Sequence, residues 1–225
     1  MPCPSVLNHS SVDDGRSYHP EAYQRGGDVI GQWQAIARHQ QAKDRVLIPL
    51  LAQHFVPGRL LELGAGVGQL SLMLRDLGWD TVSSDFQPFF VEHQRSLGLE
   101  AHVVDATDIE HAGLGRFDNL FSHSITPFIT HDYDIVAKTY RSTRQALTPG
   151  GVMVMVHAME KWRDVAAEMR RHEALARQAG YTRVQVFRNQ LLPSAAYRPP
   201  FTRLARAAEL MLGRRLGSRF VLVAS

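Results

Sequence analysis

The sequence is poor in cysteine and has no long apolar run. Cys3 is the only cysteine among 225 residues, which excludes an intrachain disulfide and a zinc site built from thiolates. No apolar stretch approaches the roughly 18 residues that a membrane-spanning helix needs. The first residues do not show the basic segment followed by an apolar one that is typical of a secretory signal. These absences predict a cytoplasmic protein with no membrane span and no metal site.

Acidic residues are scarce at the end of the chain. The formal net charge is +3, but from Tyr181 onward there are eight arginines and one acid, Glu209, so this segment carries +7 and the preceding part −4. A basic tail can bind nucleic acid or a phosphorylated substrate. Neither interleaved aromatic residues nor a compact basic block accompanies these arginines, however. We therefore expect a solvated helix face paired with carboxylates elsewhere, and no nucleic-acid partner.

Short apolar runs alternate with amphipathic stretches along most of the chain. A hydrophobic content of 44% with 21% charged residues is typical of a globular domain. The expected strands are Arg59–Leu63, Thr81–Asp85, Ala101–Asp105, Phe117–Ser122, Gly151–His157, Arg183–Phe187 and Arg219–Ala224. The expected helices are Tyr18–Phe55, Gln69–Leu77, Pro88–Leu97, Asp132–Leu147, Trp162–Ala179 and Pro199–Leu212. This alternation predicts an α/β fold, a doubly wound and mostly parallel sheet with helices on both faces.

Two segments stand outside the regular alternation. Residues 1–57 are expected to form an N-terminal helical segment or lid, separated by Pro57-Gly58 from a domain of residues 58–225. Near the end, apolar residues recur at helical spacing behind a double proline: Phe201, Leu204, Ala208 and Met211. This spacing predicts a helix that packs through its apolar face.

The most specific local pattern is the segment Leu60–Gly68, at a strand-to-helix junction. Its glycines, which allow a tight turn and a close approach of a ligand, are Gly64, Gly66 and Gly68. The dinucleotide fingerprint places its third glycine one position later, where this chain has Gln69. No Lys-Ser/Thr pair follows the turn, which excludes a P-loop. Glu62, two residues before the first glycine, adds a hydrogen-bond acceptor.

The segment Glu62–Gly68 resembles the first motif of class I S-adenosylmethionine-dependent methyltransferases. The resemblance continues in order along the chain, through Asp85 at the end of the second strand, Val103–Asp108, Phe117-Asp118 and Leu147–Gly151. Five ordered motifs over about residues 59–157 are far more specific than one glycine turn. The resemblance implies a seven-stranded sheet, a final strand antiparallel beside the fifth, and S-adenosylmethionine as cofactor.

The same resemblance implies roles for individual residues. The cofactor-binding residues would be Glu62, Gly64, Ala65, Gly66, Gly68, Asp85, Phe86, Asp105, Ala106 and Ser122. The glycine turn would contact the amino-acid end, and Asp85 both ribose hydroxyls. Phe86 would lie beside the adenine, Asp105 and the Ala106 amide would bind its polar edge, and Ser122 would flank the methionine portion. All of them are expected at the carboxyl ends of strands, where open α/β sheets bind ligands.

Candidate residues on the acceptor side are histidines and aromatics. His123 would lie nearest the cofactor and is the candidate general base, which is required only for a protonated and weakly acidic acceptor. Further along lie His131 and Tyr133, and His157 is expected at the open rim of the fifth strand. Three aromatics of the N-terminal segment complete the set: Tyr18, Tyr23 and Trp33. Their rings would either stabilise a cation or anchor the lid to the domain.

The acceptor motifs of several methyltransferase subfamilies are missing. No Asn/Asp-Pro-Pro-Tyr/Phe follows the fourth strand, and no Pro-Cys nucleophile is present. Transfer of a methyl group to a small-molecule acceptor is therefore the favoured function. Two alternatives stay open, because one fold supports different chemistries. One is another reaction of the same cofactor, cyclisation or aminopropyl transfer releasing methylthioadenosine, and the other is a non-catalytic methyltransferase-like binding subunit.

Overall fold

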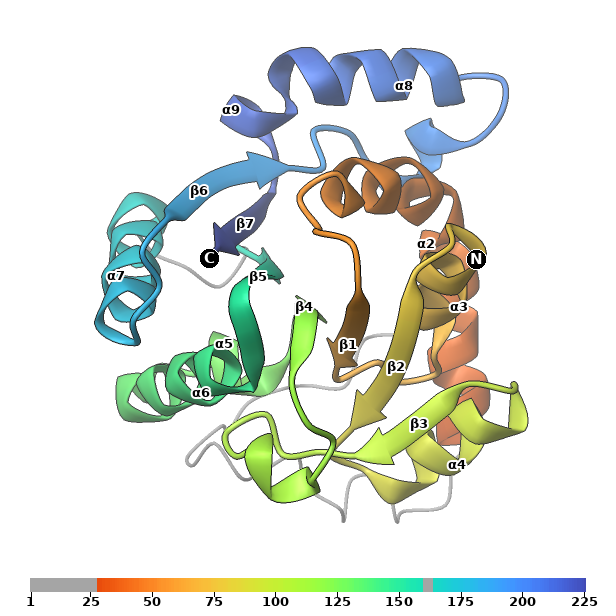
Figure 1. Ribbon diagram of the computed structural model, residues 1–225. Helices are drawn as coiled ribbons and strands as arrows, with labels where there is room; N and C mark the ends of the chain where they lie inside the picture. The colour runs from red at the N-terminus through yellow and green to blue at the C-terminus, as the bar shows by residue number, and fades with distance from the viewer. Residues whose placement is uncertain (1–27, 160–163) are drawn as a thin grey trace.

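The sheet has seven strands in the order β3-β2-β1-β4-β5-β7-β6 (Figure 1). The computed structural model describes residues 28–159 and 164–225. Its strands are β1 Arg59–Leu63, β2 Asp80–Asp85, β3 Glu100–Val103, β4 Phe117–His123, β5 Leu147–Ala158, β6 Val184–Asn189 and β7 Arg219–Ala224. β1 pairs in parallel with both β2 and β4, whereas β7 runs antiparallel between β5 and β6. The fold class and the antiparallel last strand are therefore confirmed.

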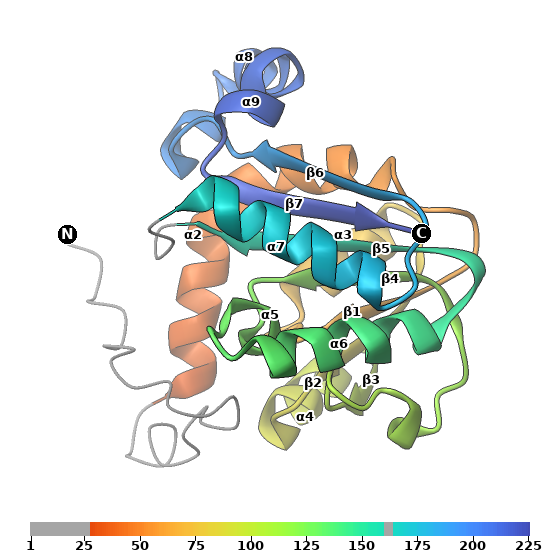
Figure 2. The same cartoon turned by 90° about the vertical axis from the view of Figure 1, so that its left-hand side faces the viewer.

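Helices cover both faces of the sheet (Figures 1 and 2). On one face lie α2 Val29–Ala52, α3 Gln69–Asp76 and α4 Pro88–Ser96, and on the other α5 Thr126–Ile129, α6 Tyr133–Ala146 and α7 Val165–Gln178. Along β5, Val152, Val154 and Val156 pack in one hydrophobic cluster, while Met153 and Met155 pack in the other. Successive side chains of a strand point to opposite faces, so one apolar run serves two cores.

The helix α2 is built into the domain along its second half. Asp28 caps its start by accepting a hydrogen bond from the Gly31 amide at 2.7 Å. Ile48 and Leu51 belong to the same buried cluster as Leu60 and Phe121 of the sheet. This half of α2 therefore serves as core. The division of the chain at residue 57 stays a prediction.

The segment between β6 and β7 folds as expected but packs through the opposite face. It contains η2 Ser194–Tyr197, α8 Thr202–Ala208, the π-helical turn η3 Glu209–Gly213 and α9 Arg214–Leu216. The expectation that its apolar residues pack inward is wrong: Phe201, Leu204 and Met211 are 58%, 70% and 72% exposed. Ala205 instead packs on Val46 and Leu47 of α2. The small side chain allows the close approach that a leucine would prevent.

Two negative findings apply to residues 28–159 and 164–225. No helix there has the length and hydropathy needed to cross a membrane. No group of three or more histidine, cysteine or acidic side chains in these ranges could hold a metal ion.

Candidate cofactor site and acceptor pocket

The glycine turn joins β1 to α3, and its three glycines have different tasks. All three adopt left-handed backbone, with φ of 67° at Gly64, 54° at Gly66 and 75° at Gly68. A side chain at Gly64 would overlap Ile125 Cγ2, and one at Gly68 would lie 2.9 Å from Leu99 Cδ1. At Gly66, no atom lies within 4 Å of an added Cβ. Gly64 and Gly68 are thus needed for packing, whereas the space beside Gly66 is open to a ligand.

A buried chain of polar side chains supports this turn from below. Glu62 accepts a hydrogen bond from Ser71 Oγ at 2.5 Å, and the hydroxyl oxygens of Ser71 and Ser83 are 2.9 Å apart. Ser83 donates to Gln94 Oε1, and Gln94 Nε2 donates to the Gly66 carbonyl at 2.7 Å. Sequence reasoning missed the two serines and the glutamine. A weak signal exists in α3, where Ser71 precedes the buried Leu74 by three residues.

The carboxyl group of Glu62 has a raised pKa. It is 2% exposed, and burial raises its pKa to about 7, with Asp85 and Asp44 adding repulsion and the Ser71 hydrogen bond opposing them. A cationic group placed near this carboxyl would favour its ionised form. The ammonium of an amino-acid ligand at the glycine turn meets that requirement.

Asp85 links the ends of the first two strands. It is 8% exposed, and its carboxylate accepts the amide hydrogens of Gly66 and Gln87, each at 2.9 Å. Burial raises its pKa, and the backbone hydrogen bonds from Gln87, Gly66 and Phe86 oppose that rise. A carboxylate offers about four acceptor directions, so about two remain for the hydroxyls of a ligand.

The next strand end offers an apolar surface and a turn. Phe86 is 58% exposed, and Val103, the register partner of Asp85, is 47% exposed. Asp105 lies beyond the end of β3 rather than within it, and its Oδ1 accepts the amide and the hydroxyl of Thr107, both at 2.8 Å. Ala106 beside it is buried. Exposed apolar side chains at adjacent strand ends can pack against a flat ring. Sequence reasoning did not select Val103 as a site residue.

Two serine hydroxyls beside the end of β4 are buried without a partner. Within the described part of the chain, Ser122 Oγ and Ser124 Oγ have no hydrogen-bond acceptor or donor. Ser124, which sequence reasoning did not select, has a φ of 58°, a backbone strain that persists only where its surroundings impose it. Orphaned polar atoms of this kind need an explanation, and a bound polar ligand supplies one. With Asp85 and the open space at Gly66, these residues fit S-adenosylmethionine.

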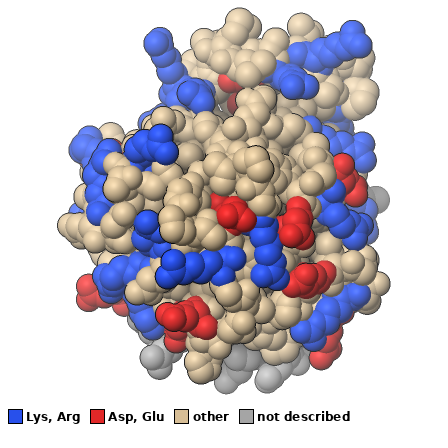
Figure 3. Space-filling view, in the orientation of Figure 1, with Lys and Arg blue, Asp and Glu red and all other residues tan. Residues whose placement is uncertain are grey.

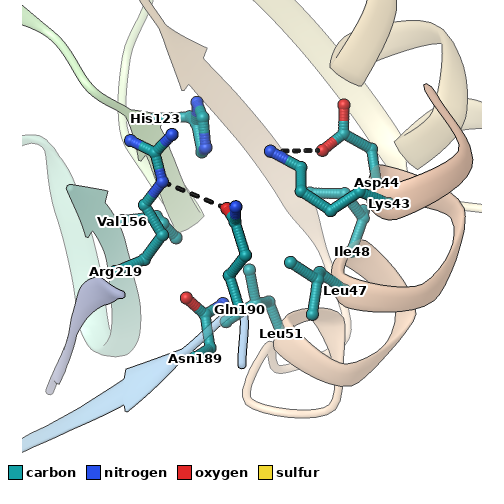
Figure 4. A pocket seen from close by; sticks show the side chains of 10 residues that line it. All are labelled: Lys43, Asp44, Leu47, Ile48, Leu51, His123, Val156, Asn189, Gln190 and Arg219. Atoms are coloured by element: carbon teal, nitrogen blue, oxygen red, sulfur yellow. Dashed lines mark hydrogen bonds and ion pairs between the residues drawn. The ribbon is translucent and has the colours of Figure 1, made fainter. Parts of the chain in front are cut away.

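The candidate acceptor pocket lies beside α2 (Figure 4). It is lined by Lys43, Asp44, Leu47, Ile48, Leu51, His123, Val156, Asn189, Gln190 and Arg219. Lys43 Nζ lies 3.3 Å from Asp44 Oδ1, with both side chains almost fully buried, and Arg219 Nε donates to Gln190 Oε1 at 3.1 Å. Asp44 also accepts from Gln69 Nε2 at 3.4 Å, which connects the pocket to the end of the glycine turn.

Most polar residues of the acceptor pocket were missed from the sequence. Lys43 and Asp44 were read as part of a polar stretch, yet each lies four residues before a buried residue, Leu47 and Ile48. Helical spacing therefore places all four on one face. Gln190 and Arg219 follow Lys43 and Asp44 by more than 140 positions in the sequence. No local signal predicts that these distant residues line the same pocket.

His123 occupies the pocket as a neutral ring. Burial, followed by repulsion from Lys43 and Arg219, lowers its pKa to about 3. A group of such low basicity is a poor proton acceptor near neutral pH, but it can donate or accept a hydrogen bond. The free volume in the pocket is only about 10 Å³, room for about one water molecule, so an acceptor has to displace side chains to enter.

The other residues expected on the acceptor side lie elsewhere. The expectation for His157 is wrong, since this side chain is 4% exposed within β5, and burial lowers its pKa to about 2. Tyr133 donates its hydroxyl to Glu168 at 3.0 Å and so ties α6 to α7, and His131 is exposed in the preceding turn. Trp33 packs edge-to-face on Phe90 of α4 with ring centroids 6.0 Å apart, an anchoring contact. Tyr18 and Tyr23 lie outside the described residues.

Comparison with known proteins gives the class. Residues 61–155 match the family model described as a methyltransferase domain, a span that includes the glycine turn, Asp85, Asp105 and His123. Together with the sheet order, this match identifies residues 61–155 as the core of a class I S-adenosylmethionine-dependent methyltransferase domain, a family whose methyl donor is S-adenosylmethionine. A search of curated protein sequences gives no match.

Solved structures share the fold at low sequence identity. A possible histamine N-methyltransferase from Thermotoga maritima has 13% identity, with 87% of this chain and 95% of that chain covered and a TM-score of 0.61. A putative methyltransferase from Haloferax volcanii, in complex with the activator Trm112, has 19% identity, 88% and 98% coverage and a TM-score of 0.58. A glycopeptide N-methyltransferase complexed with S-adenosylmethionine has 15% identity, 83% and 86% coverage and a TM-score of 0.56.

Proposed function

We propose that this protein methylates a small molecule bound in the acceptor pocket between α2 and the ends of β4 and β7. The observation that carries the proposal is the contact between the two sites. Gln69 follows the last glycine of the turn and donates to Asp44 of the pocket, and His123 of the pocket is the last residue of β4. A methyl group at the cofactor end would therefore face a group held in the pocket.

Some residues would bind the methyl donor, and others would orient the methyl acceptor. Bound S-adenosylmethionine supplies an electrophilic methyl group on a sulfonium, which transfers by direct displacement. Asp85 would hold the ribose, and Phe86, Val103 and the turn at Asp105 the adenine. Such a reaction depends on alignment and on exclusion of water more than on an elaborate set of catalytic groups.

In the pocket, the chain's own groups would orient the acceptor. His123 is neutral, so it would position an amine or hydroxyl by a hydrogen bond rather than remove a proton from a weak acid. The buried charges of Lys43 and Asp44 supply a donor and an acceptor in a place with little competing water. These features favour a small polar acceptor over a nucleic acid, because the pocket is narrow and enclosed by α2.

A product assay tests the proposal. The purified protein is incubated with S-adenosylmethionine and a panel of small amines, phenols and carboxylic acids, and the products are separated by mass spectrometry. The expected product is S-adenosylhomocysteine, formed only with an acceptor and lost in Asp85→Ala. Release of methylthioadenosine without any methylated product would contradict methyl transfer. Tight cofactor binding without any turnover of the whole panel would favour a binding subunit.

A further inference from the structure

The insertion between β6 and β7 is built with its apolar side outward. The residues that face the domain are Ala205, Glu209 and Gly213, which are spaced four residues apart and buried. The large apolar residues stand in solvent, with exposed fractions of 58% for Phe201, 70% for Leu204, 61% for Leu210, 72% for Met211, 45% for Leu212 and 62% for Leu216. We call these six residues and the five arginines of residues 198–215 the outer face. Exposed apolar groups gathered in this way mark an interaction surface.

The π-helical turn contributes to this arrangement. Leu210, Met211 and Leu212 are consecutive and lie between the buried positions Glu209 and Gly213, so all three are exposed together. π-helical turns are rare and occur mostly at functional sites. Glu209 is fixed inward because its carboxylate accepts the Tyr197 hydroxyl and the Leu191 amide. The outward position of the apolar residues is thus imposed by buried polar contacts.

The charge of the outer face has one sign. Its exposed arginines are Arg198, Arg203, Arg206, Arg214 and Arg215. The single acid of residues 198–216 is Glu209, which is 5% exposed. In Figure 3 the surface over α8 and α9, at the top of the view, carries arginine side chains among mostly uncharged residues. The expected pairing of these arginines with carboxylates is limited: no ion pair is found for any of the five within the described residues, and the Arg214 guanidinium instead lies over the ring of Phe187 in β6, 4.6 Å from its centroid.

We propose that the outer face docks on an anionic phospholipid surface. Leucine, methionine and phenylalanine side chains insert at the boundary between headgroups and acyl chains, while guanidinium groups bind phosphates through bidentate hydrogen bonds. Each basic residue near an anionic leaflet adds attraction that salt weakens. This departs from the expectation of no membrane association, which considered spanning segments alone. The proposal does not depend on the methyl transfer proposed above.

The charge also argues against a second copy of this chain as the occupant. A twofold interface would bring the same patch of both subunits together. Arg203 and Arg206 would then oppose their own copies with no exposed acid between them, which is unfavourable.

Vesicle binding tests the proposal on the full chain. Sedimentation with vesicles of phosphatidylcholine alone is compared with vesicles of phosphatidylcholine and an equal amount of phosphatidylglycerol. The parent should bind the anionic vesicles only, and high salt should release it. L204S/M211S should lose at least tenfold in binding. R203Q/R206Q should lose about 30-fold, which at 1.4 kcal/mol per factor of ten corresponds to about 1 kcal/mol for each arginine.

A matched control uses two apolar residues exposed elsewhere. L77S/L97S changes side chains that are 46% and 37% exposed at the ends of α3 and α4, and it should bind vesicles as the parent does. Circular dichroism and cofactor affinity confirm that each variant is folded. The proposal is overturned if the parent ignores anionic vesicles, or if L204S/M211S binds them equally well. It is equally overturned if the outer face instead mediates a dimer, seen by sedimentation velocity and abolished by L204S/M211S, with no vesicle binding.

Discussion

The cofactor half and the acceptor half of this site are assembled in different ways. The cofactor half, from Glu62 to Asp105, uses neighbouring strand ends of one continuous segment and holds open space beside Gly66. The acceptor half joins α2, β4 and the two ends of the insertion, residues 43 to 219, and has room for about one water molecule. The first has open space for a ligand beside Gly66, whereas an acceptor held in the second would have to displace side chains. Variants in the two halves should therefore affect different steps.

Removal of Asp85 should give the largest effect on cofactor binding. Asp85→Ala deletes a carboxylate proposed to accept two ribose hydroxyls, at a cost of roughly 2–4 kcal/mol, or about 30- to 1000-fold in affinity. Calorimetric titration with S-adenosylhomocysteine measures it.

Asp118→Ala is the matched control for this change. Asp118 accepts hydrogen bonds from the Arg59 amide and the Thr148 hydroxyl, each at 2.9 Å. These contacts lie at the amino ends of β1 and β4, the ends of the strands opposite to the glycine turn. This variant should lose stability and keep its cofactor affinity. Equal affinity of Asp85→Ala and the parent would show that the ribose is bound elsewhere.

The buried carboxyl of Glu62 should make stability depend on pH. Its pKa rises from an ordinary 4.5 to about 7 on folding, so between these values the folded chain holds a proton that the unfolded chain has lost. Stability should then fall as pH rises through this window. At about 1.4 kcal/mol per pH unit, the fall is about 3 kcal/mol.

Two variants at this network should shift the pH dependence in opposite directions. Glu62→Gln cannot ionise, so chemical denaturation at pH 5 and pH 8 should show a much smaller difference than in the parent. Ser71→Ala removes the hydrogen bond that lowers the pKa of Glu62, so its fall in stability should extend to higher pH and be larger in total. The same pH dependence in Glu62→Gln as in the parent would assign the proton to another group.

Gly66 tests whether the open space is where the cofactor lies. Gly66→Ala and Gly98→Ala both place a methyl in left-handed backbone, with φ of 54° and 74°, and neither methyl meets an atom within 4 Å. Each should lose about 1–2 kcal/mol of stability. At a cofactor concentration about 100 times Kd, the parent and Gly98→Ala should regain about 2.7 kcal/mol, and Gly66→Ala little or none. Thermal unfolding with and without S-adenosylmethionine measures this gain in stability. An equal gain in Gly66→Ala and Gly98→Ala would show that the glycine turn does not contact the cofactor.

The smallest effect is expected at His123. A general base typically contributes about 10²- to 10⁴-fold to rate. Because the pKa of His123 is lowered to about 3, we expect His123→Gln to reduce kcat less than tenfold and to leave cofactor affinity unchanged. The pH profile of kcat, with an acceptor found in the product assay, should show no inflection from His123 between pH 5 and 8. A hundredfold loss with disappearance of an inflection near neutrality would restore His123 as the base.

The fold and the cofactor half could be predicted from the sequence because their determinants are local. Alternating apolar segments place seven strands, and strand ends that neighbour one another in a parallel sheet bring Gly66 and Asp85 together. The weakest local inference was His157, where a polar residue at the end of a strand suggested exposure, whereas its side chain is buried on the sheet face near His172 of α7.

What could not be predicted depends on contacts between distant segments. The meeting of Lys43, His123 and Arg219 follows from α2 packing over the sheet and from β7 inserting beside β5. The outer face shows the same limit: periodicity places Phe201, Leu204 and Met211 on one side of a helix, but not whether that side faces the domain. The buried Glu209 and the small Ala205 settle the orientation, because a satisfied carboxylate and a close approach to α2 outweigh burial of the leucines.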